Sequence, residues 1–126
     1  MDGARRGTLL AIDHVQLAMP PGAEAQARRF YAGALGLVEE AKPADLAARG
    51  GCWFAGGALR IHLGVESEFR AARKAHPAFR VSGLDALLDR CRAAGAAVSE
   101  IETRREGRRA YVDDPFGNRI ELVEIG

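Results

Sequence analysis

The sequence is poor in cysteine and has no long apolar run. Its two cysteines, Cys52 and Cys91, stand far apart, without the spacing of a metal or redox motif. We therefore expect two buried thiols in a reducing compartment. No apolar run approaches the roughly 18 residues of a membrane span, and residues 1–10 include no apolar core of signal-peptide length. These absences predict a cytoplasmic protein without a membrane segment.

The sequence also lacks an excess of charge of either sign. Eighteen basic and 17 acidic residues leave a formal net charge of +1, so no surface suited to nucleic acid or to a membrane is expected. Hydrophobic residues make up 48% of the chain and charged residues 28%, as in folded globular proteins. A chain of 126 residues is long enough for one domain with a real core. We expect a single domain, residues 1–126, whose partner is a small molecule.

Hydrophobic periodicity predicts the same order of elements twice. The expected strands are residues 9–19, 37–42, 52–55 and 59–63, and then 76–82, 97–102, 109–113 and 119–124. A helix from about Ala23 ends before Gly36, and a second helix, capped by Ser82, ends before Gly95. This is an α+β fold of two tandem βαβββ units, about 9–64 and 76–124, joined by a charged connector, 65–75. With both helices on the outside, the two units would form a cupped mixed sheet around a cavity.

The closing strands of the two units match most closely. Arg60-Ile61-His62-Leu63 in the first corresponds to Arg119-Ile120-Glu121-Leu122 in the second. Before the second of these strands, the turn 113–118 has a proline, a glycine and side chains that can bond the local backbone. This turn sets the register that points Glu121 away from the apolar face, because a slip of one residue would reverse every side chain.

Side-chain alternation places four metal-binding types on the cavity face. The bulky apolar residues of the first and last strands would face the helices, and the residues of opposite parity include His14, His62, His76 and Glu121. A lone histidine on a sheet is more often a structural or surface residue than a ligand. Here, however, all three histidines of the chain occupy repeat-equivalent positions. Three imidazoles and a carboxylate predict a site for a first-row divalent ion.

The sequence resembles the vicinal oxygen chelate superfamily, from about Leu9 to Glu124. This superfamily includes glyoxalase I, fosfomycin-resistance thiol transferases, extradiol dioxygenases, methylmalonyl-CoA epimerase and bleomycin-resistance proteins. The resemblance rests on residues 12–15, on Phe30-Tyr31 with Leu35-Gly36-Leu37, on residues 84–95, and above all on Asp114-Pro115-Phe116-Gly117-Asn118-Arg119-Ile120-Glu121.

The resemblance implies a divalent metal ion (Zn, Ni, Mn, Fe or Co) and a homodimer. His14, His76 and Glu121 match the His-His-Glu ligands of the fosfomycin transferases. His62 stands where glyoxalase I has a fourth ligand, usually Glu or Gln. It could complete the metal site, hydrogen-bond a bound water or substrate, or act as a base. The site could lie within one chain or be shared between two.

The expected chemistry is that of a metal-bound substrate with two vicinal oxygens. Glu121 or His62 would act as the catalytic base. Lyase, isomerase or thiol-transfer chemistry is expected first, with dioxygenase chemistry as a further possibility. Substrate-binding candidates are Arg60, Trp53, Arg109, Tyr111 and Arg119, and the arginines favour an anionic substrate. The alternative function is metal-free sequestration of a drug or metabolite, as in bleomycin-resistance proteins.

Overall fold

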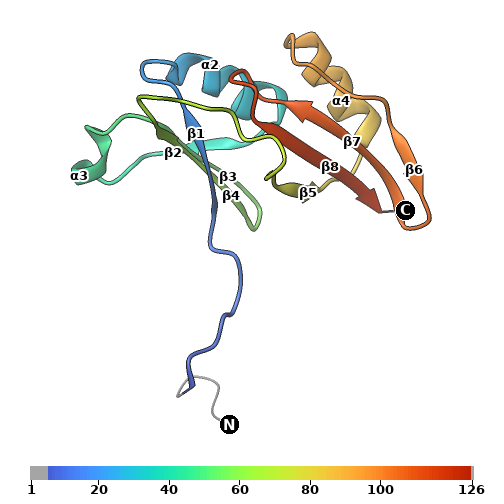
Figure 1. Ribbon diagram of the computed structural model, residues 1–126, viewed down its shortest axis with the longest axis horizontal. Coiled ribbons are helices and arrows are strands. Elements are labelled where there is room, and N and C mark those ends of the chain that lie inside the picture. Colours follow the sequence, from blue (N-terminus) through green and yellow to red (C-terminus); the bar gives the residue numbers. More distant parts are fainter. Residues whose placement is uncertain (1–5, 126) are drawn as a thin grey trace.

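The computed structural model describes residues 6–125 and contains two βαβββ units, as predicted (Figure 1). The elements of the first unit are β1 (Val15–Met19), α2 (Glu24–Arg28), η1 (Arg29–Ala34), β2 (Val38–Glu40), α3 (Ala44–Ala47), β3 (Cys52–Gly56) and β4 (Leu59–Val65). Those of the second are β5 (Ala78–Arg80), α4 (Leu84–Ala93), β6 (Glu102–Arg104), β7 (Gly107–Asp113) and β8 (Arg119–Ile125). No helix within residues 6–125 is long and apolar enough to span a membrane.

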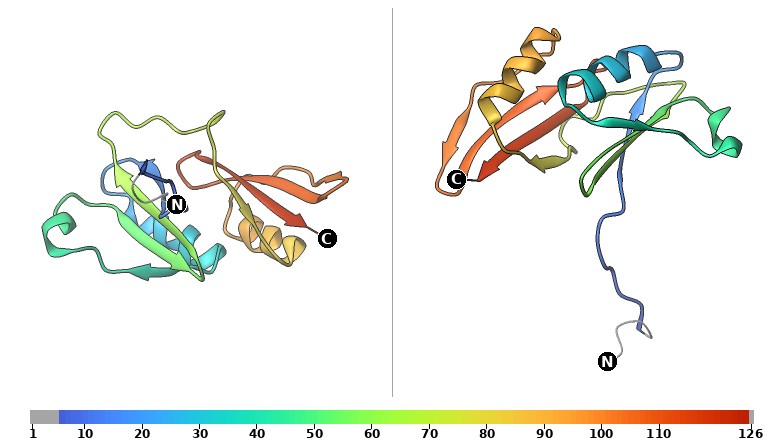
Figure 2. Two further views of the ribbon diagram at one scale, coloured as in Figure 1. Left: turned by 90° about the horizontal axis from the view of Figure 1, so that it is seen from below. Right: turned by 180° about the vertical axis from the view of Figure 1, so that it is seen from behind.

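Each unit forms its own four-stranded mixed sheet. The first sheet has the order β1-β4-β3-β2, and the second has the equivalent order β5-β8-β7-β6. In both, the first strand is parallel to the last one, with Val15 opposite Ile61 and Ala78 opposite Glu121. Strands β1 and β5 therefore each lie at a sheet edge. Within one chain the two sheets lie apart, side by side rather than as one continuous sheet (Figure 2).

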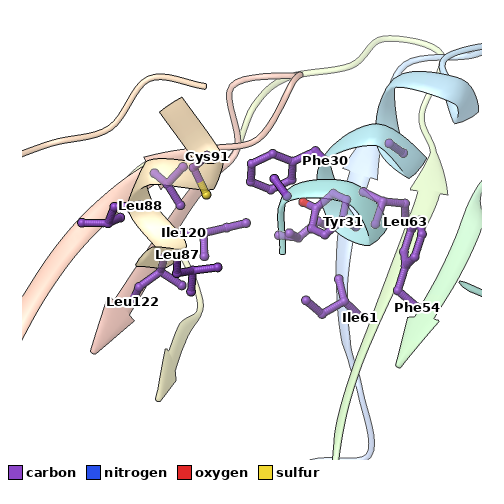
Figure 3. Close-up of a cluster of buried hydrophobic side chains, with 14 of the residues drawn as sticks. Phe30, Tyr31, Phe54, Ile61, Leu63, Leu87, Leu88, Cys91, Ile120 and Leu122 are labelled. Atoms are coloured by element: carbon purple, nitrogen blue, oxygen red, sulfur yellow. The ribbon is translucent and has the colours of Figure 1, made fainter. Parts of the chain in front are cut away.

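The predicted apolar parity is confirmed by burial. Ile61, Leu63, Ile120 and Leu122 are all at most 2% exposed. These side chains belong to one cluster with residues of η1 and α4, so the core is continuous across both units (Figure 3). Since apolar side chains fill one face of each sheet, residues of the opposite parity lie on the other face.

The first helix widens into a π-helical turn. The Leu35 amide bonds to the Phe30 carbonyl, five residues back, at 2.9 Å. Gly36 follows with φ +77°, which confirms it as the residue that ends the helix.

The start of the second helix differs from the prediction. Ser82 is not the cap, because Gly83 occupies that position with φ +67° and no side-chain cap. The Leu84 amide instead donates to the Glu124 carboxylate at 2.9 Å.

Four predicted strands are shorter than expected, and one of them is β2, which spans only Val38–Glu40 instead of residues 37–42. β1 begins at Val15 rather than residue 9, so His14 lies just before the strand. β5 has only three residues, following Pro77, which has no amide hydrogen to donate to a ladder. The strand expected at 97–102 reduces to a single bridge between Val98 and Val112, and β6 begins only at Glu102. Of residues 1–10, in which no signal-peptide core is expected, residues 1–5 lie outside the described part of the chain.

Candidate functional site

The four predicted ligands lie in two pairs, one on each sheet. His14 and His62 belong to the first sheet, and their rings stack with centroids 4.0 Å apart. His76 and Glu121 belong to the second, with Nε2 and Oε1 3.1 Å apart. Within residues 6–125 no three His, Cys, Asp or Glu side chains gather as a metal site. The four residues therefore do not converge within one chain, and their role as ligands stays a prediction.

The imidazole of His76 has one nitrogen on the backbone and the other on a carboxylate. Its Nδ1 lies 3.0 Å from the Lys74 carbonyl and 3.2 Å from that of Arg73. Both carbonyls are acceptors, so Nδ1 must carry a hydrogen. In a neutral ring, Nε2 then presents a lone pair to Glu121, which is also an acceptor. A cation or a second ring proton is needed between them.

The carboxylate of Glu121 is 7% exposed and is held on both sides. Oε1 faces His76, and Oε2 accepts from Arg109 Nη1 at 2.7 Å. The Glu121 amide donates to the Pro77 carbonyl at 3.0 Å, and this bond fixes β8 against the chain beside His76. Because Arg109 occupies only one oxygen, the other remains directed at the imidazole.

Of two further predicted residues, Tyr111 contacts this pair and Arg119 lies beside Tyr111. Tyr111 lies opposite Glu121 in the β7–β8 register and meets the His76 ring edge-on at 5.5 Å. The guanidinium of Arg119 lies 5.2 Å from the centre of the Tyr111 ring, and both line a hollow of about 330 Å³. Arg109, Tyr111 and Arg119 thus lie around one half of the candidate site.

The pair on the first sheet is built on stacked rings. His62, 8% exposed, lies between His14 and Trp53, and the Trp53 ring is 4.0 Å away at an interplanar angle of 6°. Burial lowers the pKa of His62, and the nearby His14 lowers it further. His14 Nδ1 contacts the Asp13 carboxylate at 2.9 Å, which leaves Nε2 open. With Arg60, these rings line a pocket of about 440 Å³.

A buried polar network positions the second pair, and the sequence did not predict its long-range members. Asp114 is 4% exposed and accepts hydrogen bonds from the Tyr31 hydroxyl at 2.7 Å and from the Asn118 amide at 2.9 Å. The Asn118 side chain donates to the Ala18 carbonyl and accepts from the Ala72 amide, both at 2.9 Å. Asn118 thereby joins the turn before β8 to β1 and to the connector leading to His76. No local spacing reveals a bond between residues 83 positions apart.

Sequence and structure comparisons agree on one family. The profile of the glyoxalase-like domain matches residues 17–123. A protein from Bacillus anthracis, assigned to the glyoxalase family, is 45% identical with a TM-score of 0.88, covering 96% of this chain and 99% of its own. The fosfomycin resistance protein FosX from Listeria monocytogenes is 18% identical with a TM-score of 0.76, covering 94% of this chain and 96% of its own. A glyoxalase family protein from Enterococcus faecalis is 17% identical with a TM-score of 0.71, covering 90% and 97%.

A comparison with curated proteins found none that matches. The family is established by two other matches: the glyoxalase-like profile over residues 17–123, and the Bacillus anthracis protein with 45% identity over 96% of the chain. The chain therefore belongs to the glyoxalase-like domain family of the vicinal oxygen chelate superfamily.

Proposed function

We propose that this protein is a metal-dependent enzyme whose metal centre is shared between two copies of the chain. One copy would supply His14 and His62, and the other would supply His76 and Glu121. The ion would be a first-row divalent metal, Zn, Ni, Mn, Fe or Co, because imidazole and carboxylate ligands suit these ions. The substrate would be a small molecule with vicinal oxygens.

The observation that carries this proposal is the orientation of His76. Metal-binding histidines usually donate their second ring nitrogen to a carbonyl or carboxylate, as Nδ1 does here. Two neighbouring ligands that each lie about 2.1 Å from one ion are about 3.0 Å apart in octahedral coordination and about 3.4 Å apart in tetrahedral coordination. The 3.1 Å between His76 Nε2 and Glu121 Oε1 lies between these two spacings. This pair therefore fits two of the ligands that a divalent ion needs.

A second copy is the natural source of the remaining ligands. β1 and β5 are both sheet edges, so neither is covered by a further strand of its own sheet. His14 immediately precedes β1, and His76 lies two residues before β5. Joining β1 of one copy to β5 of another would bring the two pairs together. His62 would then be a fourth ligand or a base beside the ion.

Each side chain has a defined task in this proposal. A bound divalent ion would polarise a substrate carbonyl and stabilise the negative charge that follows proton loss. Arg109 keeps Glu121 oriented through Oε2 and leaves Oε1 for the ion. Burial lowers the pKa of His62, and its ring could accept a substrate proton where it is not itself a ligand of the ion. Arg60 and Arg119 would hold an anionic group, and Trp53 and Tyr111 would pack against the substrate. Lyase, isomerase or thiol-transfer chemistry fits this set, and dioxygenase chemistry would follow from Fe.

One observation favours a second candidate, the metal-free sequestration of a drug or metabolite. The Arg109–Glu121 ion pair and the ring stack of Trp53, His62 and His14 place charged and aromatic groups where a ligand could contact them. A protonated His76 would satisfy Glu121 equally well. Aromatic faces and charged groups of this kind can hold a flat ligand.

Metal titration separates the two candidates. Apo protein is titrated calorimetrically with Zn, Ni, Mn, Co and anaerobic Fe(II), and the purified protein is examined by elemental analysis. We expect one ion per chain, and Glu121→Gln should weaken binding at least 100-fold with an unchanged circular dichroism spectrum. Glu100→Gln, an exposed carboxylate on another segment, is the matched control. The metal-dependent function is excluded if no ion binds, or if Glu121→Gln binds as tightly as the wild type.

A further inference from the structure

A second hollow lies where the first helix meets the end of α4. It has a volume of about 730 Å³, which is larger than the hollows beside Tyr111 and His62 and within the range of small-molecule sites. It is lined by residues within 26–33, 94–97 and 113–117, and we call it the helix-side hollow. Both helices lie on the same side of the two sheets (Figure 1). None of the four candidate metal ligands lines this hollow, so it is a place for a different molecule.

One wall of the helix-side hollow is a single face of the first helix. The wall consists of Gln26, Arg29, Phe30 and Gly33. Residues that are three, four and seven positions apart lie on one face of a helix. The last three of these residues belong to η1, the π-helical turn. Such turns are rare and frequently lie at functional sites, so this face is a candidate for ligand binding.

Two long-range hydrogen bonds hold the walls of the hollow in place. The Tyr31 hydroxyl donates to the Asp114 carboxylate at 2.7 Å, which joins η1 to the turn before β8. Arg90 Nε donates to the Ala34 carbonyl at 3.0 Å, which joins α4 to η1. Because both bonds are internal to the fold, the hollow is a built-in feature of the chain, as small-molecule sites usually are.

The lining has one unpaired charge, that of Arg29. Within residues 6–125 the Arg29 guanidinium makes no ion pair and no hydrogen bond. The two acids of the lining are already occupied. Asp113 Oδ1 accepts from Arg73 Nη1 at 2.8 Å, and the buried Asp114 carboxylate accepts four hydrogen bonds. Gln26 is exposed like Arg29 and adds an amide to the same helix face, so the rim of the hollow offers positive charge and hydrogen-bond donors.

Most of the remaining lining is small and apolar. It consists of Phe30, Gly33, Ala94, Gly95, Ala96, Ala97, Pro115 and Gly117. The small side chains leave room for the body of a ligand, and burial of apolar surface is favourable. A guanidinium binds a carboxylate through two parallel hydrogen bonds. A dianion such as a phosphate monoester fits less well, because a single unpaired cation stands here beside two carboxylates.

We propose that the helix-side hollow binds a small monocarboxylate with an apolar body. Arg29 and Gln26 hold the carboxylate at the rim. The apolar body lies against Phe30, Pro115 and the alanines that follow α4. Every group of this site comes from one chain, so the site goes beyond the proposed metal centre and depends neither on an ion nor on a second copy.

The new site adjoins the candidate metal site without sharing a proposed ligand. Ala97 and Asp113 line both the helix-side hollow and the hollow beside Tyr111. None of the arginines proposed to hold the substrate of the metal centre lines the helix-side hollow. Binding of a carboxylate must therefore be mapped to residues, because an anion could also reach the arginines of the metal centre.

A two-dimensional NMR titration with sodium hexanoate maps the binding. The largest amide shifts are expected within residues 29–33, 94–97 and 113–117. The uncharged 1-hexanol has the same apolar body and should bind about 10-fold more weakly or less, since it lacks the charge-assisted hydrogen bonds. The proposal is overturned if hexanoate causes no shifts, or if the shifts centre on Tyr111 and Arg119. Tighter binding of hexyl phosphate than of hexanoate would contradict a monocarboxylate site.

Two substitutions on the helix face test the lining. Arg29→Gln removes the charge, keeps a good helix former and should weaken hexanoate binding about 10-fold or more. Gly33→Leu should fill the hollow, and the fold can accept it because the closest atom to a Cβ there, beyond its own helical turn, is the Arg28 carbonyl oxygen at 4.0 Å. Circular dichroism should be unchanged for both. If either folded variant binds hexanoate as tightly as the wild type, the proposal fails.

Two controls distinguish this site from a general effect of charge and from the metal centre. Arg105→Gln removes an exposed arginine outside the lining and should leave the affinity for hexanoate unchanged. A loss as large as that of Arg29→Gln would show an effect of net charge and would overturn the proposal. Glu121→Gln should also bind hexanoate normally, because Glu121 is not part of the lining. Loss of binding in that variant would place hexanoate at the metal centre instead. Failure of the metal titration leaves these expectations unchanged.

Discussion

Replacement of Asn118 by alanine should destabilise the fold and loosen the candidate site together. The Asn118 side chain is fully buried and makes three hydrogen bonds, to the Ala18 carbonyl, the Ala72 amide and the Asp114 carboxylate, each 2.9 Å long. Each such bond contributes about 1 kcal/mol net, so the loss in unfolding free energy should be about 3 kcal/mol. For a domain of this size that corresponds to a fall in Tm of about 10 °C.

The structure also specifies where the variant should loosen. Ala72 belongs to the connector that leads to His76, and Asn118 precedes the strand that contains Glu121. Urea unfolding gives the free energy, and hydrogen exchange gives the local effect, which should be greatest at residues 70–77. Gln26→Ala, at an exposed position of α2, should change stability by less than about 0.5 kcal/mol. A loss below about 1 kcal/mol for Asn118→Ala would refute the view that this side chain joins the two units.

Three further substitutions test other parts of the structure. Tyr31→Phe removes the hydroxyl donor that lies 2.7 Å from Asp114 and should lower the unfolding free energy by about 1–2 kcal/mol in urea titrations. A variant as stable as the wild type would show that this hydrogen bond does not stabilise the fold. Glu24→Gln should destabilise the protein at pH 7, because the Gly51 amide holds the Glu24 pKa below its ordinary value of 4.5. That stabilisation is present above pH 4.5 and is lost as the pH falls through the lower pKa of the folded state. The melting temperatures of the wild type and of Glu24→Gln should therefore become equal in acid. A difference in melting temperature that is the same at every pH would contradict a stabilisation by the ionised Glu24 carboxylate. Gly117→Ala should lower the unfolding free energy by about 1–2 kcal/mol and weaken metal binding, since Gly117 has φ +92° in the turn that sets the register of β8. An insertion at Gly117 should damage both the fold and the site. Unchanged stability and metal affinity in both variants would exclude a role of this turn in setting the register.

The sequence predicted the parts of the fold that depend on local periodicity. Alternation in Ile61-His62-Leu63 and Ile120-Glu121-Leu122 assigned the apolar residues to the core, and burial confirms this. The glycines that end the helices were also correctly placed, because positive φ is a local requirement.

Contacts between segments that are distant in the sequence could not be predicted from local periodicity. The length of β1 depends on where β4 can pair with it, and that pairing begins at Val15. Likewise Arg109 was predicted as a substrate ligand from its strand alone, and local periodicity did not indicate its ion pair with Glu121. The separation of the four predicted ligands into two pairs follows from the sheet order, which no single segment encodes.

Complementation between two inactive variants tests the shared metal centre most directly. His14→Ala and Glu121→Ala proteins each lack one ligand in both sites of a homodimer, so neither should bind a divalent ion tightly. Mixed and allowed to exchange subunits, they form heterodimers in which one site has lost both ligands and the other is intact. The mixture should therefore regain tight binding of one ion per heterodimer, measured by calorimetry with the metal alone. If binding is not regained although heterodimers form, the metal centre is not shared between two copies in the way proposed here.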